Sequence, residues 1–291
     1  NIEYIDSIKN DIKWLGYKWD SIHYASDYFE QLYTFAQMLI KNNYAYVDSS
    51  SSEIIKKERG TLTEPGIKSK DRERLPDESL KIFEQMKQGK FDDGEYVLRL
   101  KIDMSSPNIN MRDPVIYRIK KVEHHRTKNE WCIYPMYDFT HCISDAIENI
   151  THSLCTLEFE DHRDLYEWVI EKINHENQPQ QIEFARLALE HNLMSKRKLN
   201  ELVEKKYVEG WDDPRMPTLS GMKRRGYTPN AIKDFCNRIG ITKKNSAIEM
   251  GVLENTIREE LNLTAKRVMG VLDPIKVTLV NYPKDKTEII K

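Results

Sequence analysis

Short strand-like runs alternate with helical patterns over residues 131–189. The strand-like runs lie at 131–134, 151–158 and 181–189, and the helical patterns lie at 138–148 and 162–173. This order is typical of βαβ units, in which a helix carries the chain back so that successive strands pair in parallel. The sequence therefore predicts an α/β fold with a parallel sheet in this part of the chain.

The sequence of the N-terminal part predicts helices and an antiparallel strand. Residues 1–19 and 27–42 carry apolar side chains at helical spacing, so we expect a helix in each range. Residues 60–76 contain two glycines, two prolines and seven charged side chains, which predicts an irregular loop. Residues 96–104 alternate strictly between apolar and polar side chains. We therefore expect a half-buried antiparallel strand, with Arg99 on its polar face.

Residues 199–262 have a different character. They carry short helical patterns broken by glycine and proline, which indicates a small all-α region. Strand-like residues resume at about 271.

A chain of 291 residues is long enough for roughly two domains. It contains no run of about 18 apolar residues, so we expect no transmembrane helix.

Charge and cysteine content exclude several classes of protein. The chain has 45 Lys and Arg against 47 Asp and Glu, a net charge of -2, so any nucleic-acid site must be a local patch. The four cysteines include no CxxC pair, which argues against a zinc ribbon and a disulfide framework. His141, His152 and Cys155 fit no common metal-ligand spacing. We expect reduced thiols and no protein-held metal.

Two polar segments are candidates for chemistry, although GxGxxG, GxxxxGK[ST], GxSxG and HExxH motifs do not occur. Ser195 is followed by three cations in Lys196-Arg197-Lys198. Such a loop can stabilise charge on a transferring phosphoryl group, but a solvated basic loop has the same composition. Residues 131–159 gather aromatic, imidazole and hydroxyl side chains near predicted strand ends, where α/β sheets bind ligands. An aromatic core is the alternative interpretation.

Three longer segments are more specific: WCIYPMYDFTHCISDAIENITHSLCTLEFEDHRDLYEW, RLALEHNLMSKRKLNELV and VEGWDDPRMPTLSGMKRRGYTPNAIKDFC. They closely resemble the glutaminyl-tRNA synthetases, a branch of the class I aminoacyl-tRNA synthetases, and the resemblance extends over essentially the whole chain. It implies an α/β fold, with part of a nucleotide-binding parallel sheet, an inserted α+β domain, an all-α subdomain and the start of a β-barrel. The implied parts are a part of the catalytic nucleotide-binding domain (1–26), the acceptor-stem-binding insertion (27–136), the second half of the catalytic domain (137–190), the MSKRK loop with the helical subdomain (191–262), and the start of the anticodon-binding β-barrel (263–291).

The resemblance implies an ATP-dependent ligase that activates glutamine with the help of Mg²⁺ and transfers it to the 3′ end of tRNA(Gln). It also implies a cytoplasmic monomer without membrane attachment. The closest alternative is a glutamyl-tRNA synthetase of the archaeal and eukaryotic type, which shares the fold and an MSKR-like loop. The Thr140-His141-Cys142 segment favours the glutaminyl branch.

Two expected features of the family do not occur in the sequence. These are the HIGH motif of class I synthetases and the acidic segment that binds the amino group of the substrate. In the family both would precede Asn1, and most of the anticodon-binding barrels would follow Lys291. We therefore expect an internal fragment with little or no activation chemistry of its own, and a non-catalytic tRNA-binding fragment remains a further alternative.

The resemblance also implies roles for individual residues. MSKRK corresponds to the family's KMSKS loop, with Leu193 in place of Lys and Arg197 in place of Ser. Its catalytic residues would be Ser195 and Lys196, and Lys196 would support the pyrophosphate leaving group. The full set expected around ATP is Thr156, Arg186, Leu187, Met194, Ser195 and Lys196. The glutamine side chain would lie against Tyr137, His141 and Phe159. Asp161 would read the acceptor-stem minor groove, and Leu62 would open the end of the acceptor stem.

Overall fold

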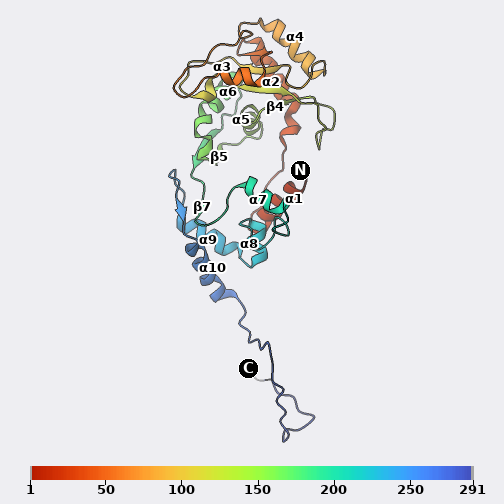
Figure 1. Cartoon of the computed structure of the whole chain (residues 1–291), viewed down its shortest axis with the longest axis vertical. Helices are drawn as coiled ribbons and strands as arrows, with labels where there is room; N and C mark the ends of the chain where they lie inside the picture. Colours follow the sequence, from red (N-terminus) through yellow and green to blue (C-terminus); the bar gives the residue numbers. More distant parts are fainter. Residues whose placement is uncertain (1, 290–291) are drawn as a thin grey trace.

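A four-stranded antiparallel sheet lies at the centre of the upper lobe of the computed structural model, which describes residues 2–289 (Figure 1). Its strands, in spatial order, are β1 (Ala45–Asp48), β2 (Val97–Leu100), β3 (Val115–Ile119) and β4 (Ile133–Pro135). Helices α2 (Phe29–Lys41) and α4 (Pro76–Lys87) pack against each other and against β1. Leu32, Ala36 and Leu39 recur at helical spacing on α2 and are fully buried, so the expected amphipathic helix is confirmed.

Two further helices complete the core of this lobe. Helix α5 (Tyr137–Ile147) follows β4 directly and packs against α6 (Arg163–Ile173). Four short helices lie in the connections between these helices and strands: η1 (Ala25–Tyr28), α3 (Ser52–Glu58), η2 (Ile109–Met111) and η3 (Leu157–His162). Helix α3 begins after Ser51, whose hydroxyl accepts a hydrogen bond from the Ile54 amide. Such a cap stabilises the start of a short helix.

The parallel strands predicted over residues 131–189 are confirmed in part. Strand β5 (His152–Thr156) pairs in parallel with β6 (Gln180–Phe184), and α6 connects them as a βαβ unit. Strand β7 (Ala188–Leu189) pairs in parallel with β8 (Ala247–Ile248). Strand β4 instead pairs antiparallel with β3, so residues 131–134 do not belong to the parallel sheet. The α/β class is thus confirmed, with the parallel strands in two short pairs.

The lower lobe is mainly helical. Helices α7 (Lys196–Glu204), α8 (Leu219–Arg225), α9 (Pro229–Ile239) and α10 (Met250–Thr264) follow one another, and α9 packs against α10. Helix α1 (Ile2–Trp14) lies beside α8 (Figure 1), where the Ser220 hydroxyl donates to Asp11 Oδ1 at 3.0 Å. The region expected to be all-α also contains β8, because β7 supplies a parallel partner for it.

Arg99 is not on a solvent-exposed face, and this expectation from the alternating pattern is wrong. Its side chain is fully buried because Tyr46, Asp48 and Met104 enclose the guanidinium. Its guanidinium lies 2.7 Å from Asp48 Oδ2 and donates to the Asp113 carbonyl at 2.8 Å. A buried charge is tolerated only when it is paired in this way.

The C-terminal segment 266–289 extends away from the lower lobe without helix or strand (Figure 1). The strands expected from about 271 are therefore not formed, because no strand within residues 2–289 supplies partner hydrogen bonds there. Leu272 is 97% exposed. The assignment of 263–291 to an anticodon-binding barrel stays a prediction. All four cysteines are free thiols, and no helix among the described residues is long and apolar enough to cross a membrane.

Candidate functional site

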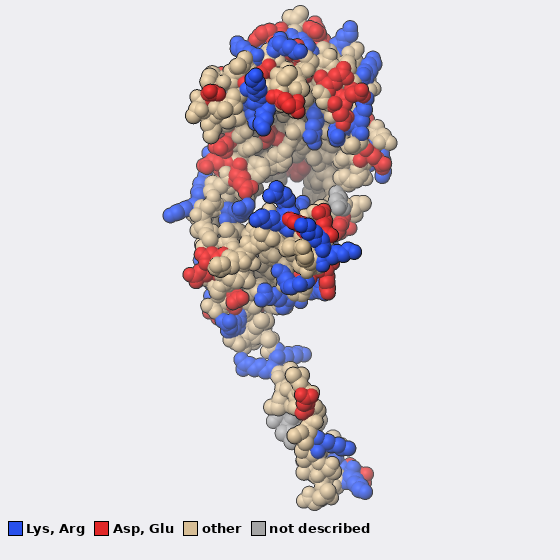
Figure 2. Space-filling view, in the orientation of Figure 1, with Lys and Arg blue, Asp and Glu red and all other residues tan. Residues whose placement is uncertain are grey.

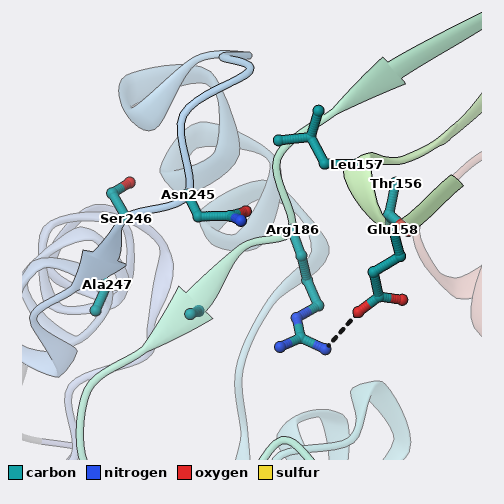
Figure 3. Close-up of a pocket in the computed structure, with 8 residues that line it drawn as sticks. Thr156, Leu157, Glu158, Arg186, Asn245, Ser246 and Ala247 are labelled. Carbon is teal, nitrogen blue, oxygen red and sulfur yellow. Dashed lines mark hydrogen bonds and ion pairs between the residues drawn. The ribbon is translucent and has the colours of Figure 1, made fainter. Parts of the chain in front are cut away.

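A cavity of about 420 Å³ lies where the carboxyl end of β5 approaches β7 and β8 (Figure 3). Its lining residues are Thr156, Leu157, Glu158, Arg186, Ala188, Asn245, Ser246 and Ala247. The Arg186 guanidinium lies 3.1 Å from Glu158 Oε1, and both side chains are exposed. The cavity thus combines an accessible cation with the strand ends at which α/β folds bind ligands.

The structure brings together only some of the residues expected around ATP. Thr156 and Arg186 line the cavity, and Leu187 packs against the hydrophobic core of the lower lobe. Met194, Ser195 and Lys196 are not among the lining residues. Asn245 and Ser246 do line it, although nothing in the sequence singled them out. Only the pairing of β8 with β7 brings them to the cavity.

The MSKRK loop lies against α1. Ser195 is the residue before α7, and Lys196 is the first residue of that helix. Lys196 Nζ lies 4.5 Å from the centre of the Tyr4 ring. An ammonium group over an aromatic face is held by a cation–π attraction. In this arrangement Lys196 is held by α1, and an ATP contact would require it to leave Tyr4.

The three residues expected around the glutamine side chain do lie together. The Tyr137 and His141 rings are stacked with centres 5.2 Å apart, and the Tyr137 and Phe159 rings are 5.3 Å apart. Tyr137 and His141 share a face of α5 because they are four residues apart, and Phe159 comes from η3. Tyr137 is 53% exposed, so the cluster forms an accessible surface and not an internal core.

A partly buried hydrogen-bond network contacts His141. Asp145 Oδ2 accepts hydrogen bonds from the Ser153 hydroxyl at 2.5 Å and the Tyr166 hydroxyl at 2.9 Å, and it lies 3.1 Å from His141 Nε2. Burial acts to raise the pKa of Asp145, but hydrogen bonds led by His141 and Ser153 outweigh it and leave this pKa below its usual value. Asp145 and Ser153 stood out in the sequence only as polar residues of a mixed segment, and Tyr166 did not stand out.

A second network fixes Phe159. The Gln181 side-chain amide donates to the Phe159 carbonyl and to Glu183 Oε1, both at 2.9 Å. Arg163 forms a two-point ion pair with Glu183, with Nε donating to Oε1 at 2.8 Å and Nη2 donating to Oε2. The hydrogen bonds from Arg163, with that from Gln181, overcome the effect of burial and lower the pKa of Glu183 to about 2. The ionised carboxylate therefore holds the strand that supports the aromatic cluster.

Hydrogen bonds from Arg112 fix the backbone of the loop that carries Leu62. Leu62 is 81% exposed, while the buried Arg112 donates through Nη1 to the carbonyls of Arg59, Thr61 and Glu64 at 2.8–2.9 Å. Gly60 has φ +73°, and a Cβ there would lie 2.7 Å from the Glu64 carbonyl oxygen. An apolar side chain is thus presented to solvent on a well-supported loop.

The backbone of Asp161 is bound by Asn108 and Asn110, which lie just before Arg112 in the chain. Its side chain is exposed on η3, and its backbone carbonyl accepts hydrogen bonds from the Asn108 amide at 2.8 Å and the Asn110 amide at 3.2 Å. Asn108, Asn110 and Arg112 belong to one short segment. This segment therefore positions both residues that the resemblance assigns to the acceptor stem.

Lys and Arg side chains gather along the upper edge of the lower lobe and around α8 (Figure 2). Helix α8 ends in Lys223, Arg224 and Arg225, and α7 begins with Lys196, Arg197 and Lys198. Residues 2–289 contain no group of three or more His, Cys, Asp or Glu side chains able to hold a metal ion.

Comparisons with known proteins identify one family of tRNA synthetases. The family model described as "tRNA synthetases class I (E and Q), catalytic domain" matches residues 1–263. Proteins named glutamine–tRNA ligase from Salmonella paratyphi B (strain ATCC BAA-1250 / SPB7) and Salmonella newport (strain SL254) are each 58% identical over 291 residues. These matches cover 100% of this chain and 52% of each relative, so the chain spans about half the length of the curated relatives it matches.

Solved structures show the same fold. The crystal structure of a glutamate tRNA ligase from Elizabethkingia meningosepticum CCUG26117 has a TM-score of 0.58 and 16% identity, and the match covers 89% of this chain and 60% of that chain. A glutamate-tRNA synthetase from Elizabethkingia anophelis has a TM-score of 0.58 and 17% identity, with 89% and 61% covered. At this identity the similarity concerns the fold and not the amino acid that is attached.

Proposed function

The chain belongs to the catalytic-domain family of class I tRNA synthetases for glutamate and glutamine, and we propose that it serves in the ATP-dependent attachment of glutamine to tRNA(Gln). The observation that carries this proposal is the accessible cluster of Tyr137, His141 and Phe159, in a chain 58% identical to glutamine–tRNA ligases. The glutamine carboxylate would attack the α-phosphate of ATP, and pyrophosphate would leave. A hydroxyl of the ribose at the 3′ end of the tRNA would then attack the carbonyl of the glutaminyl adenylate, and AMP would leave.

The cluster has the chemistry that a glutamine side chain requires. Glutamine differs from glutamate by an NH₂ group in place of an oxygen, so a selective site needs hydrogen-bond acceptors for that group and no unpaired cation beside it. The Tyr137 hydroxyl and the His141 imidazole can both accept hydrogen bonds. The flat ring faces of Tyr137 and Phe159 can cover the aliphatic stem of the substrate.

The cavity beside β5 is the proposed ATP site. Thr156 and Phe159 are three residues apart, so the cavity and the aromatic cluster lie next to each other along the chain. Arg186 would exchange its exposed ion pair with Glu158 for a phosphate oxygen. Exposed ion pairs stabilise a fold very little, so this exchange costs little. Leu187, Met194, Ser195 and Lys196 are proposed to contact ATP after the MSKRK loop moves toward the cavity.

The tRNA would lie across both lobes. Leu62 is proposed to act as a wedge that unstacks the terminal base pair of the acceptor stem, and Asp161 to accept a hydrogen bond from a guanine amine in the minor groove. The cations of α7 and α8 would contact phosphates. By its relationship to the family, the enzyme is proposed to be a monomer that works in the cytoplasm.

Specificity for glutamate is the rival within the family, and a purely tRNA-binding role is the rival outside it. Both can be tested in a hybrid in which residues 1–291 replace the matching 52% of the Salmonella newport enzyme. Charging of tRNA with glutamine, and not with glutamate, supports the proposal. A folded hybrid that charges glutamate assigns the other specificity, and a folded hybrid that binds tRNA without charging it overturns the catalytic role.

A further inference from the structure

The environment of His141 fixes which of its ring nitrogens carries a proton. Nε2 lies 3.1 Å from both Asp145 Oδ2 and the Ser153 hydroxyl oxygen. The Ser153 hydroxyl has a single proton, which it donates to Asp145. Both neighbours of Nε2 are therefore acceptors, and Nε2 must be the protonated nitrogen.

Two features make this arrangement rigid. Ser153 and Tyr166 are 4% and 3% exposed, so water does not compete for their hydrogen bonds to Asp145. The four side chains also come from three elements, since His141 and Asp145 lie one turn apart on α5, Ser153 lies on β5 and Tyr166 on α6. The Tyr166 ring packs edge-on against the His141 ring with centres 5.5 Å apart, which limits rotation of the imidazole.

We propose that Asp145, Ser153 and Tyr166 are positioning residues that hold His141 as the Nε2–H tautomer, so that Nδ1 is a fixed acceptor for an N–H group of bound glutamine. This inference rests on the proposed glutamine site, which assigns only His141 and the two aromatic rings. Nδ1 makes no hydrogen bond to another side chain or backbone group within residues 2–289. The side-chain NH₂ of glutamine can donate to it, whereas the carboxylate of glutamate cannot.

Two acidic side chains of α5 each contact a different histidine. Asp145 contacts the ring edge, and its hydrogen bonds favour the ionised carboxylate. The neighbouring acid on the same helix, Asp138, is paired instead with His162 at 2.7 Å. Asp138 lies on α5 and His162 on η3, and the His162 ring packs against Phe159 with centres 5.5 Å apart. The groups that contact His141 within residues 2–289 do not include Asp138, so Asp138→Ala is a matched control for the tautomer of His141.

The tautomer can be measured directly on the 291-residue chain by nitrogen-detected NMR of its histidines. We expect a proton on Nε2 of His141 that exchanges slowly with water. Asp145→Ala should remove this protection, Asp145→Asn should retain it because the amide oxygen can still accept, and Asp138→Ala should leave His141 unchanged. A proton on Nδ1 of His141 in the unsubstituted chain, or an unchanged signal in Asp145→Ala, overturns the inference.

The effect on substrate can be measured in the hybrid enzyme. Asp145→Ala should raise KM for glutamine about tenfold while KM for ATP changes less than about twofold, since one positioned hydrogen bond is lost. Asp145→Asn should recover most of the affinity, and Tyr166→Phe should give a smaller rise if Asp145→Ala does not fold. A loss confined to kcat overturns the inference. Failure of the unsubstituted hybrid to use glutamine would instead contradict the proposed function, while the NMR result on the tautomer would stand.

Discussion

The buried guanidinium of Arg112 donates to the Thr61 carbonyl at 2.8 Å, directly before the exposed Leu62 in the chain. The same nitrogen also reaches the carbonyls of Arg59 and Glu64, and Nε donates to the Ser106 carbonyl at 2.6 Å. One side chain thus holds both ends of a short loop. An exposed apolar residue is expensive to order unless the backbone beneath it is already fixed, because each ordered residue costs conformational entropy.

Replacing Arg112 should loosen this loop. In Arg112→Leu, three loop carbonyls lose their shared donor in a buried site, and we expect the free energy of unfolding to fall by about 2–4 kcal/mol. Urea unfolding measures this loss. Hydrogen exchange should also accelerate at the amides of Thr61 and Glu64, whereas Lys57→Leu, on the exposed face of α3, should change neither quantity.

Leu62 should matter for tRNA and not for stability. We expect Leu62→Ala to leave the unfolding midpoint unchanged, since the side chain is 81% exposed. In the hybrid enzyme kcat/KM for tRNA should fall about tenfold, because opening a terminal base pair costs a few kcal/mol. A tRNA with a mismatched terminal pair should restore most of the rate. An equal loss with both tRNAs would rule out a wedge.

The comparison of sequence with structure shows what local pattern can and cannot predict. Helical spacing predicted α2 and α5 well, and the i, i+4 relation of Tyr137 and His141 follows from it directly. The burial of Arg99 and the pairing of β8 with β7 could not be predicted, because both depend on partners distant in the chain. Arg112 is a similar case, since its partners lie some fifty residues away. The roles of individual site residues came from the family resemblance and not from spacing.

Lys196 should act on the chemical step. It now lies 4.5 Å from the Tyr4 ring, and we propose that it moves to the pyrophosphate leaving group. In the hybrid enzyme Lys196→Ala should lower kcat about 100-fold with little change in KM for glutamine, as expected for a charge that stabilises the transition state. Lys198→Ala, an equal loss of charge two residues on, should mainly raise KM for tRNA. Identical effects of the two substitutions would contradict a specific role for Lys196.

The Arg163–Glu183 ion pair should make stability depend on pH in the acidic range. The pKa of Glu183 is lowered from 4.5 to about 2 in the folded chain, so the folded state favours the ionised carboxylate. The ionised Glu183 carboxylate contributes at most about 3 kcal/mol to the free energy of unfolding. This contribution is present above pH 4.5 and is lost as the pH falls toward 2. Urea unfolding at a series of pH values should therefore show a smaller acid-induced loss in Glu183→Gln than in the unsubstituted chain. Parallel losses in both proteins would contradict the lowered pKa.

The central claim is that this chain supplies the glutamine-selective part of a tRNA synthetase. The most direct test is the charging of tRNA(Gln) by the hybrid enzyme with glutamine and glutamate in parallel, alongside the unmodified Salmonella newport enzyme. We predict charging with glutamine at a rate within about tenfold of the parent and a preference over glutamate of at least about 1,000-fold, as a site built for a hydrogen-bond donor can achieve. A folded hybrid that charges glutamate equally well or better, or that charges neither amino acid, would contradict the claim.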